Sequence, residues 1–237
     1  MTCRDHSNGE NASHCEIKET TVAASGRLTV DGNKNGGVSV RGWSQNQILV
    51  RAQIQTNAPT DAEAAGMVSQ IVVSTAGGQI QASGPDFGSN HGWAVSYEIF
   101  VPHQTDLNVT AHNGGVSITD IRGNVQFDTV NGGVSLKRMA GTVHGETKNG
   151  GLNIELMGDR WDGGELNAKT TNGGVSLKVP ANYNARFEAS TVNGGISMDF
   201  PVVVSGKIGR ELATNIGAGG SLIHVTTTNG GVSVKRI

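Results

Sequence analysis

The sequence is poor in charged residues. Asp, Glu, Lys and Arg make up 16% of its 237 residues, against about 25% in ordinary globular domains. The formal net charge is −2, so the chain has no broad electrostatic attraction for nucleic acid or anionic lipid. We therefore expect no nucleic-acid partner.

Long apolar segments and familiar catalytic motifs are missing as well. No run of about 18 apolar residues occurs that could form a transmembrane helix, and the start MTCRDHSNGE lacks the apolar core of a signal peptide. The chain also contains no P-loop, no HExxH and no Ser/His/Asp set in a recognisable motif context. The sequence therefore predicts no membrane span and names no reaction.

Cysteine is scarce: the chain has two, Cys3 and Cys15, and both lie in the polar segment 1–16. A disulfide between them would fasten a loose N-terminal segment in an oxidising compartment, and this is the interpretation we favour. The nearby His6 and His14 also allow a zinc site, although the spacing matches no familiar zinc finger. A lipid-modified Cys3 or a disordered tail would also be compatible with this segment.

Glycine, by contrast, is abundant, at 35 of 237 residues, about twice its usual ~7% share. Much of it belongs to a repeated Asn-Gly-Gly motif, three copies of which are 18 residues apart. Asn tolerates positive φ and Gly adopts it freely, so we expect each motif to form a sharp corner. The copies begin at Asn35, Asn113, Asn131, Asn149, Asn172, Asn193 and Asn229.

Apolar and polar residues alternate on both sides of each corner. The residues three and five after the Asn are aliphatic or Met, with Ser between them in six of the seven copies. Thr stands two residues before the Asn in five copies. Alternation with period two is typical of a strand with one buried face. We therefore interpret each unit as a strand, a corner, a second strand and a second corner.

Two architectures fit this unit. In an antiparallel meander each Asn-Gly is a hairpin turn, whereas in a parallel β-solenoid each ~18-residue unit is one coil stacked on the next. We favour the solenoid because identical residues recur in the same column, and stacked Thr side chains could hydrogen-bond one another. The row six residues after the Asn alternates in sign from Lys137 through Glu155 and Lys178 to Asp199, which predicts a ladder of exposed ion pairs between coils.

The expected domain organisation is a tail at 1–16 followed by a single β domain at 17–237. Within that domain, 17–106 is irregular and 107–237 holds the regular coils. The segment TDAEAAGMVSQ has an N-cap candidate, Thr60 or Asp61, ahead of acidic residues. It predicts a short helix near 62–68 that covers one end of the stack.

The repeated T-x-NGGVSL units, the pair YEIFVP and TDLNV, and GRLTVDGNKNGGVSVRGW together resemble a bacterial β-strand-repeat family of unknown function whose members are grouped as adhesins. The resemblance covers residues 17–237. It implies a right-handed β-solenoid that is exported to the periplasm or cell surface, and it supplies no catalytic residues to carry over.

Candidate site residues lie in the outward rows of the solenoid. Asp128, Glu146, His144, Gln126 and His112 should share one face, where neighbouring carboxylates could bind Ca²⁺ or perform acid/base chemistry on a glycan. The simpler interpretation is that Glu146 pairs with a lysine and Asp128 is solvated.

A second candidate is Trp161, which lies in an insertion at 157–165 between Asp159 and Asp162. An exposed Trp beside charged residues could stack on a sugar ring, whereas a buried one would pack the insertion onto the body of the domain. The segment containing His91 and Trp93 is a weaker candidate of the same kind.

These observations favour a non-enzymatic exported protein whose rigid rod presents polar faces to a glycan or a cell-surface protein. The alternative is a carbohydrate-active enzyme, a hydrolase or lyase, that uses Asp128, Glu146 and His144 as its catalytic cluster. Self-association through the ends of the rod is a further expectation, and no cofactor other than Ca²⁺ is suggested.

Overall fold

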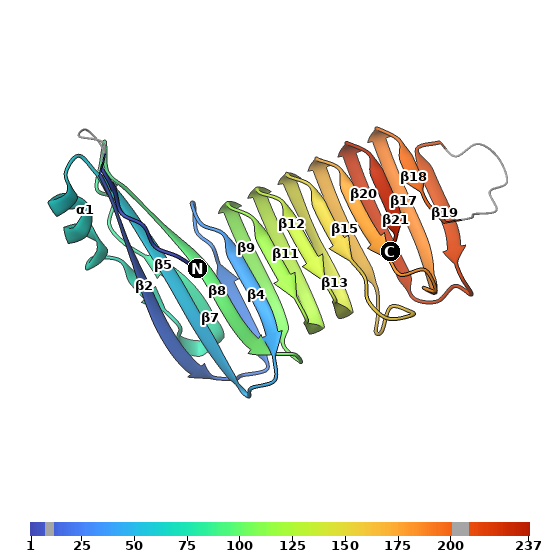
Figure 1. The fold of residues 1–237 in the computed structure, drawn as a ribbon, viewed down its shortest axis with the longest axis horizontal. Coiled ribbons are helices and arrows are strands. Elements are labelled where there is room, and N and C mark those ends of the chain that lie inside the picture. The colour runs from blue at the N-terminus through green and yellow to red at the C-terminus, as the bar shows by residue number, and fades with distance from the viewer. Residues whose placement is uncertain (8–11, 201–208) are drawn as a thin grey trace.

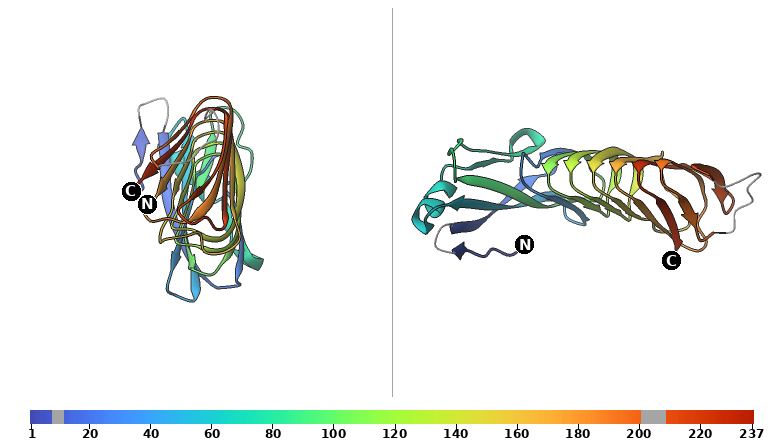
Figure 2. Two further views of the ribbon diagram at one scale, coloured as in Figure 1. Left: turned by 90° about the vertical axis from the view of Figure 1, so that its right-hand side faces the viewer. Right: turned by 90° about the horizontal axis from the view of Figure 1, so that it is seen from above.

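The structure, a computed structural model, describes residues 1–7, 12–200 and 209–237. Two long sheets form the two layers of a rod (Figure 1). Seen from one end, the chain runs in nested, flattened loops (Figure 2). The stacked strands of the first sheet are β4 (Val38–Trp43), β10 (Val116–Thr119), β12 (Val134–Lys137), β14 (Leu152–Glu155), β16 (Val175–Val179), β21 (Val232–Arg236) and β18 (Ile196–Met198). Those of the second sheet are β3 (Arg27–Asp31), β9 (Asp106–Asn113), β11 (Arg122–Asn131), β13 (Ala140–Asn149), β15 (Leu166–Asn172), β20 (Leu222–Asn229) and β17 (Ala185–Asn193).

The stacked strands pair in parallel and in register, so each column of the repeat becomes a row along the rod. Val134 of β12 pairs with Val116 and with Leu152, and Asn149 pairs with Asn131. The parallel stack predicted from the repeat is thereby confirmed, and the meander is wrong. Alternate side chains of both sheets point inward and form one continuous apolar core.

A row of buried threonines lines the core beside the corners, but its hydrogen bonds differ from the prediction. Thr147 Oγ1 donates to the carbonyl oxygen of Gly132 at 2.8 Å, and Thr170 Oγ1 donates to that of Gly150 at 2.7 Å. The expected bonds between stacked threonines are therefore wrong. Each hydroxyl instead donates to a glycine carbonyl oxygen at a corner of the neighbouring coil, so the buried threonine hydroxyl has a hydrogen-bond partner.

The two glycines of each corner have different roles. A Cβ on Gly132 would lie 2.1 Å from the carbonyl oxygen of Gly114, whereas a Cβ on Gly133 would meet nothing closer than 3.4 Å. Neither residue has a positive φ, and nor does Asn131. The first glycine is thus required by the close approach of stacked backbones, which corrects the expectation that these corners need left-handed residues.

The order of the coils along the rod differs from their order in the sequence. Strands β20 and β21, at the C-terminal end of the chain, lie between β15/β16 and β17/β18. Lys178 therefore pairs with Lys235 rather than with Asp199. The predicted ladder of alternating charges is broken at this point by the inserted coil.

The N-terminal part extends the first sheet with antiparallel strands. Strand β8 (Gly92–Pro102) pairs in parallel with β4, and β5 (Gln47–Ala58) and β2 (Ala12–Ala23) follow it in antiparallel fashion. The second sheet ends in β7 (Gln79–Ser83), which follows the short helix η1 (Ala76–Gly78), and in β6 (Val72–Ser74). At the opposite end of the rod, β19 (Glu211–Ile216) pairs antiparallel with β17.

Helix α1 (Asp61–Val68) lies at the N-terminal end of the rod (Figure 1). The hydroxyl of Thr60 accepts a hydrogen bond from the N–H of Glu63 and caps the helix. Ala64 and Met67 are buried against Ala12 and Ala58 of the neighbouring strands. The predicted short helix and its position at one end are confirmed.

The N-terminal segment crosses the outer face of the first sheet. Cys3 and Cys15 form a disulfide, and the carbonyl oxygen of Thr2 accepts a hydrogen bond from Gln53 of β5. His14 hydrogen-bonds to Asp5, and no cluster that could hold a metal ion occurs among the described residues. Strand β1 (His6–Ser7) pairs with the start of β2, which crosses the expected boundary at residue 16.

Candidate functional site

The outer face of the second sheet brings together the polar rows expected from the sequence. Asp128 pairs in register with Thr110 and with Glu146, and Glu146 pairs with Lys169 of the next strand. The row two residues earlier contains Thr29, Asn108, Gln126, His144 and Asn167. All these side chains point outward because the alternate residues between them face the core.

Two titratable members of this face, Glu146 and His144, already have protein partners. Glu146 Oε2 lies 3.9 Å from Lys169 Nζ, and His144 Nε2 lies 3.4 Å from Glu165 Oε1. This is the simpler arrangement considered for Glu146. Glu146 and His144 thus contact residues of the next coil rather than being directed together with Asp128 toward one point.

Two hollows divide the candidate residues between them. Asp128 and His112 line one of about 610 Å³, here called the Asp128 hollow, together with Asp31 and Thr110. Gln126 and His144 line a second hollow of about 460 Å³, which also contains Arg27 and several amide side chains. The sequence correctly placed these residues on one face, but their side chains line two separate depressions.

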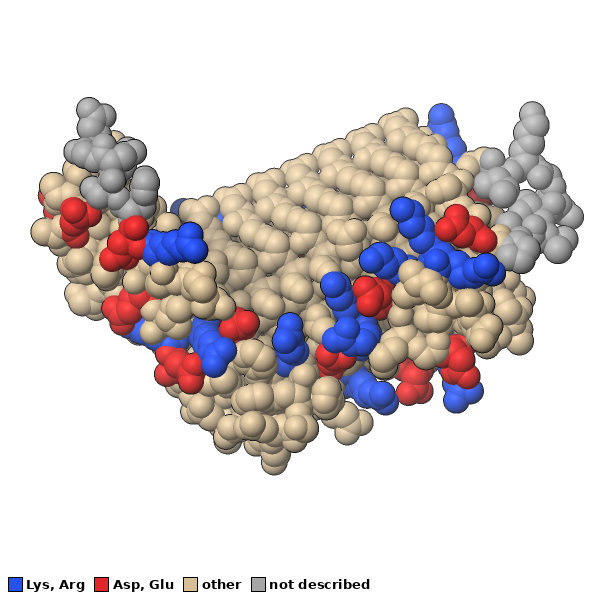
Figure 3. All heavy atoms as spheres, viewed as in Figure 1, with Lys and Arg blue, Asp and Glu red and all other residues tan. Residues whose placement is uncertain are grey.

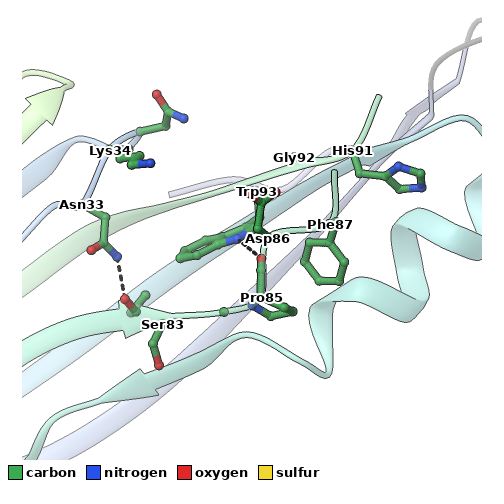
Figure 4. A pocket seen from close by; sticks show the side chains of 12 residues that line it. Asn33, Lys34, Ser83, Pro85, Asp86, Phe87, His91, Gly92 and Trp93 are labelled. Atoms are coloured by element: carbon green, nitrogen blue, oxygen red, sulfur yellow. Dashed lines mark hydrogen bonds between the residues drawn. The ribbon is translucent and has the colours of Figure 1, made fainter. Parts of the chain in front are cut away.

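A third hollow of about 450 Å³ lies where the segment after β7 passes β8 (Figure 4). We call it the Trp93 hollow. The indole of Trp93 lies between Asn33 and Phe87 in this view, and its Nε1–H donates to the carbonyl oxygen of Pro85 at 3.1 Å. Asn33 donates from Nδ2 to the carbonyl oxygen of Ala82 at 2.7 Å. A half-buried aromatic ring is therefore fixed in a depression that both polar and apolar residues line.

The Trp93 hollow adjoins the Asp128 hollow. Asn33, Lys34 and Asn35 line both of them, so the segment 33–35 forms a shared wall. The exposed ammonium of Lys34 and the carboxylates of Asp86, Asp31 and Asp128 are distributed across the two depressions. Together they form a two-part groove that carries both charge signs and one accessible indole.

A buried phenol lies close to this groove. The Tyr97 hydroxyl is buried and has no hydrogen-bond partner among the described residues. Burial, together with the negative charge of Asp31, raises the pKa of Tyr97 well above its usual range. The phenol therefore stays neutral at all physiological pH values.

Trp161 does not form a binding surface, which corrects one candidate. Its side chain is 3% exposed, and Nε1 donates to the carbonyl oxygen of Gly141 at 2.9 Å. The insertion at 157–165 is thereby packed onto the body of the rod, because a large apolar ring is more stable inside the core. Asp159 and Asp162 remain exposed, and Asp162 lies 3.7 Å from Arg122.

A ladder of asparagine side chains runs along the corners and was not predicted from the sequence. Asn131 Nδ2 donates to Asn113 Oδ1, and Asn149 Nδ2 donates to Asn131 Oδ1, each at 2.8 Å. The ladder continues from Asn149 through Asn172 and Asn229 to Asn193. Identical residues in one column were its only sequence signal. In Figure 3, a broad area over the stacked coils carries no charged side chains.

The fold and its polar faces define a solenoid-like all-β protein built from stacked parallel strands. The family described as Toastrack DUF4097 matches residues 20–235, so the chain belongs to that family. No curated protein matches the chain. No helix among the described residues is long and apolar enough to cross a membrane.

Several solved structures are similar over nearly the whole chain at low identity. A candidate cell adhesion protein from Clostridium sporogenes is 12% identical, with a TM-score of 0.49 over 94% of this chain and 100% of that one. A candidate lipid-binding protein from Parabacteroides distasonis is 11% identical, with a TM-score of 0.39 over 93% and 96%. A candidate adhesin from Bacteroides fragilis is 13% identical, with a TM-score of 0.32 over 94% and 97%. At these values the likenesses give no information about a ligand of this chain.

Proposed function

We propose that this chain is a non-enzymatic glycan-binding protein, exported to the periplasm or the cell surface, and that its binding site is the two-part groove on either side of residues 33–35. The rod that carries the groove is taken to be a right-handed solenoid with coils of about 18 residues. The observation that supports the proposal is the joining of the Trp93 hollow to the Asp128 hollow through one shared wall.

The chemistry of the groove suits a saccharide. The apolar face of a sugar ring packs on an indole, and its hydroxyls bind carboxylates and amides in a small number of fixed positions. The Trp93 hollow supplies the ring, and the Asp128 hollow supplies Asp31, Asp128 and Asn113. A chain of sugars crossing residue 34 would meet both kinds of contact.

The contacts of Glu146 and His144 argue against the catalytic cluster of Asp128, Glu146 and His144. A glycosidase needs one carboxyl group as acid and a second as base or nucleophile on opposite sides of the scissile bond. Glu146 is paired with Lys169 and His144 with Glu165, and Asp128 belongs to a different hollow from His144. Self-association through the ends of the rod stays a prediction.

A glycan array followed by titration calorimetry tests this function. Asp128→Ala should weaken binding of the best glycan by about tenfold or more, the cost of losing a hydrogen bond to a charged group. Glu155→Ala, on the first sheet, removes a carboxylate away from the groove and serves as the matched control. Equal losses in the two variants, or no glycan bound by the wild type, would contradict the proposal.

A parallel turnover screen on polysaccharides tests the non-enzymatic part. We expect no release of product by the wild type. Release of product that is lost in Glu146→Gln would show a hydrolase or lyase instead.

A further inference from the structure

Seven Asn-Gly steps lie at the corners of the rod, and six of them share one environment. In those six, the backbone N–H of the glycine donates to the asparagine carbonyl oxygen of the adjacent coil, at 3.0 to 3.3 Å. The glycine itself is half-buried, or buried in the case of Gly36. The six donors are Gly36, Gly114, Gly132, Gly150, Gly173 and Gly230.

The seventh step, Asn193–Gly194, lies in the last coil of the stack. Gly194 is exposed, and its N–H has no hydrogen-bond partner among the described residues. Strand β19 pairs with β17 from Ala185 only as far as Ser190, so it ends before the corner. Asn193 donates from Nδ2 to Asn229 Oδ1 at 2.8 Å, while its own Oδ1 has no partner in the described part of the chain.

We propose that Asn193 is a site of spontaneous deamidation, with water as the reagent, and that the stacking of the coils protects the other six. The backbone nitrogen of Gly194 loses its proton to solvent and attacks Cγ of Asn193. The bond from Cγ to Nδ2 breaks, ammonia leaves, and a five-membered succinimide remains. Water then opens the ring and leaves aspartate or isoaspartate.

Protection follows from the first of these steps. A glycine nitrogen whose proton is held by a carbonyl oxygen must break that bond before it can act as a nucleophile. Gly132 and Gly150 donate in this way at 3.0 Å, and their asparagines are further fixed by the side-chain ladder. Within the described part of the chain, Gly194 has neither this bond nor the corner of another coil stacked beyond it.

The modification has a structural consequence at the end of the rod. Deamidation replaces the amide donor that Asn193 offers to Asn229 with a carboxylate, which faces the oxygen Oδ1 of Asn229. Strand β18 is held to β21 by three residue pairs. We therefore expect the product to have a looser last coil, with faster hydrogen exchange in β18 than the unmodified chain.

Peptide mapping after incubation of the full chain at mildly alkaline pH tests the proposal. Trypsin places Asn193 in the peptide 187–207 and Asn131 in 123–137, and it also separates the remaining corners. Conversion at Asn193 should be at least tenfold faster than at any of the other six corners, a difference of about 1.4 kcal/mol in barrier. In guanidinium chloride the seven rates should converge, because unfolding removes the protection. Asn8, which also precedes a glycine, lies outside the described residues and is scored separately.

Two results would overturn the proposal. One is conversion of an internal corner in the folded chain as fast as that of Asn193. The other is seen in Asn193→Ala, which removes the reactive amide but keeps the backbone carbonyl that accepts from Gly230. Asn229 should stay protected in this variant, and its conversion at the former rate of Asn193 would show that the backbone bond does not protect.

Discussion

The clearest consequence of the close stacking is that two adjacent glycines should respond very differently to the same substitution. Gly132→Ala places a methyl group 2.1 Å from the carbonyl oxygen of Gly114 and 2.5 Å from its carbonyl carbon. Both atoms belong to the backbone, so no side chain can rotate away. Gly133→Ala places the same methyl group 3.4 Å from the carbonyl oxygen of Gly151.

These distances set the expected magnitudes. Overpacking against a fixed backbone costs about 3 kcal/mol or more, since the coils must move apart to relieve it. At Gly133 the contact is nearly an ordinary one, and alanine also restricts the unfolded chain, so the change should stay within about 1 kcal/mol of zero. For a protein of this size, 3 kcal/mol corresponds to a Tm lower by about 6 to 12 °C.

Urea unfolding and thermal melting of the two variants provide the assay. Gly133→Ala is the matched control, since it makes the same chemical change one residue away. If the two variants lose equal stability, or if Gly133→Ala loses more, steric exclusion between coils does not explain the first glycine of the corner.

Two further changes test hydrogen bonds inside the stack. Thr147→Val removes the bond from Oγ1 to the carbonyl oxygen of Gly132 and should cost about 1 kcal/mol in urea unfolding; unchanged stability would mean that the bond contributes nothing. Arg138 donates two bonds of 2.6 Å to Asp120 and holds the pKa of that carboxyl below its ordinary value of 3.8. Because the pKa of Asp120 is lower in the folded chain than in the unfolded chain, the ionised carboxylate stabilises the fold at pH values above its unfolded-state pKa. This stabilisation is lost as the pH falls through the folded-state pKa. Arg138→Met should therefore cost about 1 kcal/mol at neutral pH and nothing well below pH 3.8, as measured by unfolding across that range; a cost independent of pH would contradict the ion pair.

The parallel stack could be predicted from the sequence because the repeat itself determines which residues of neighbouring strands pair. Aliphatic residues, Ser and Thr recur at fixed distances from most of the repeated Asn residues, and equal columns can line up only when neighbouring strands run in the same direction. The capping helix was predictable for a similar local reason, since Thr60 and the acidic first turn mark its start.

The order of the coils was not predictable, because the repeats are nearly interchangeable. Strand β20 offers β15 the same apolar and Thr columns that β17 would have offered. Only the spacing of 36 residues between Asn193 and Asn229, twice the regular 18, hints at a different path. The predicted charge ladder is wrong for the same reason, because Lys178 pairs with Lys235 instead of Asp199.

The candidate site was predictable in part. Gln126, Asp128 and Glu146 share a face because strand alternation directs them outward. The groove beside them was not predictable, since its wall at 33–35, the start of β8 with Trp93 and the end of β9 are distant in the sequence. The burial of Trp161 could not be predicted, because the charged residues beside it in the sequence indicate an exposed segment. Those residues are exposed in the structure, but the indole ring packs into the core.

The insertion of the C-terminal coil is tested most directly by pairs of introduced cysteines. Ser233 lies opposite Ser176 on one side and Ser197 on the other. Neighbouring strands are about 4.8 Å apart, within reach of a disulfide, whereas strands two positions apart are about 10 Å away and beyond it. Oxidation should cross-link Ser176→Cys with Ser233→Cys, and Ser197→Cys with Ser233→Cys, but not Ser176→Cys with Ser197→Cys. Efficient cross-linking of that last pair would show that the coils stack in sequence order and would contradict the account.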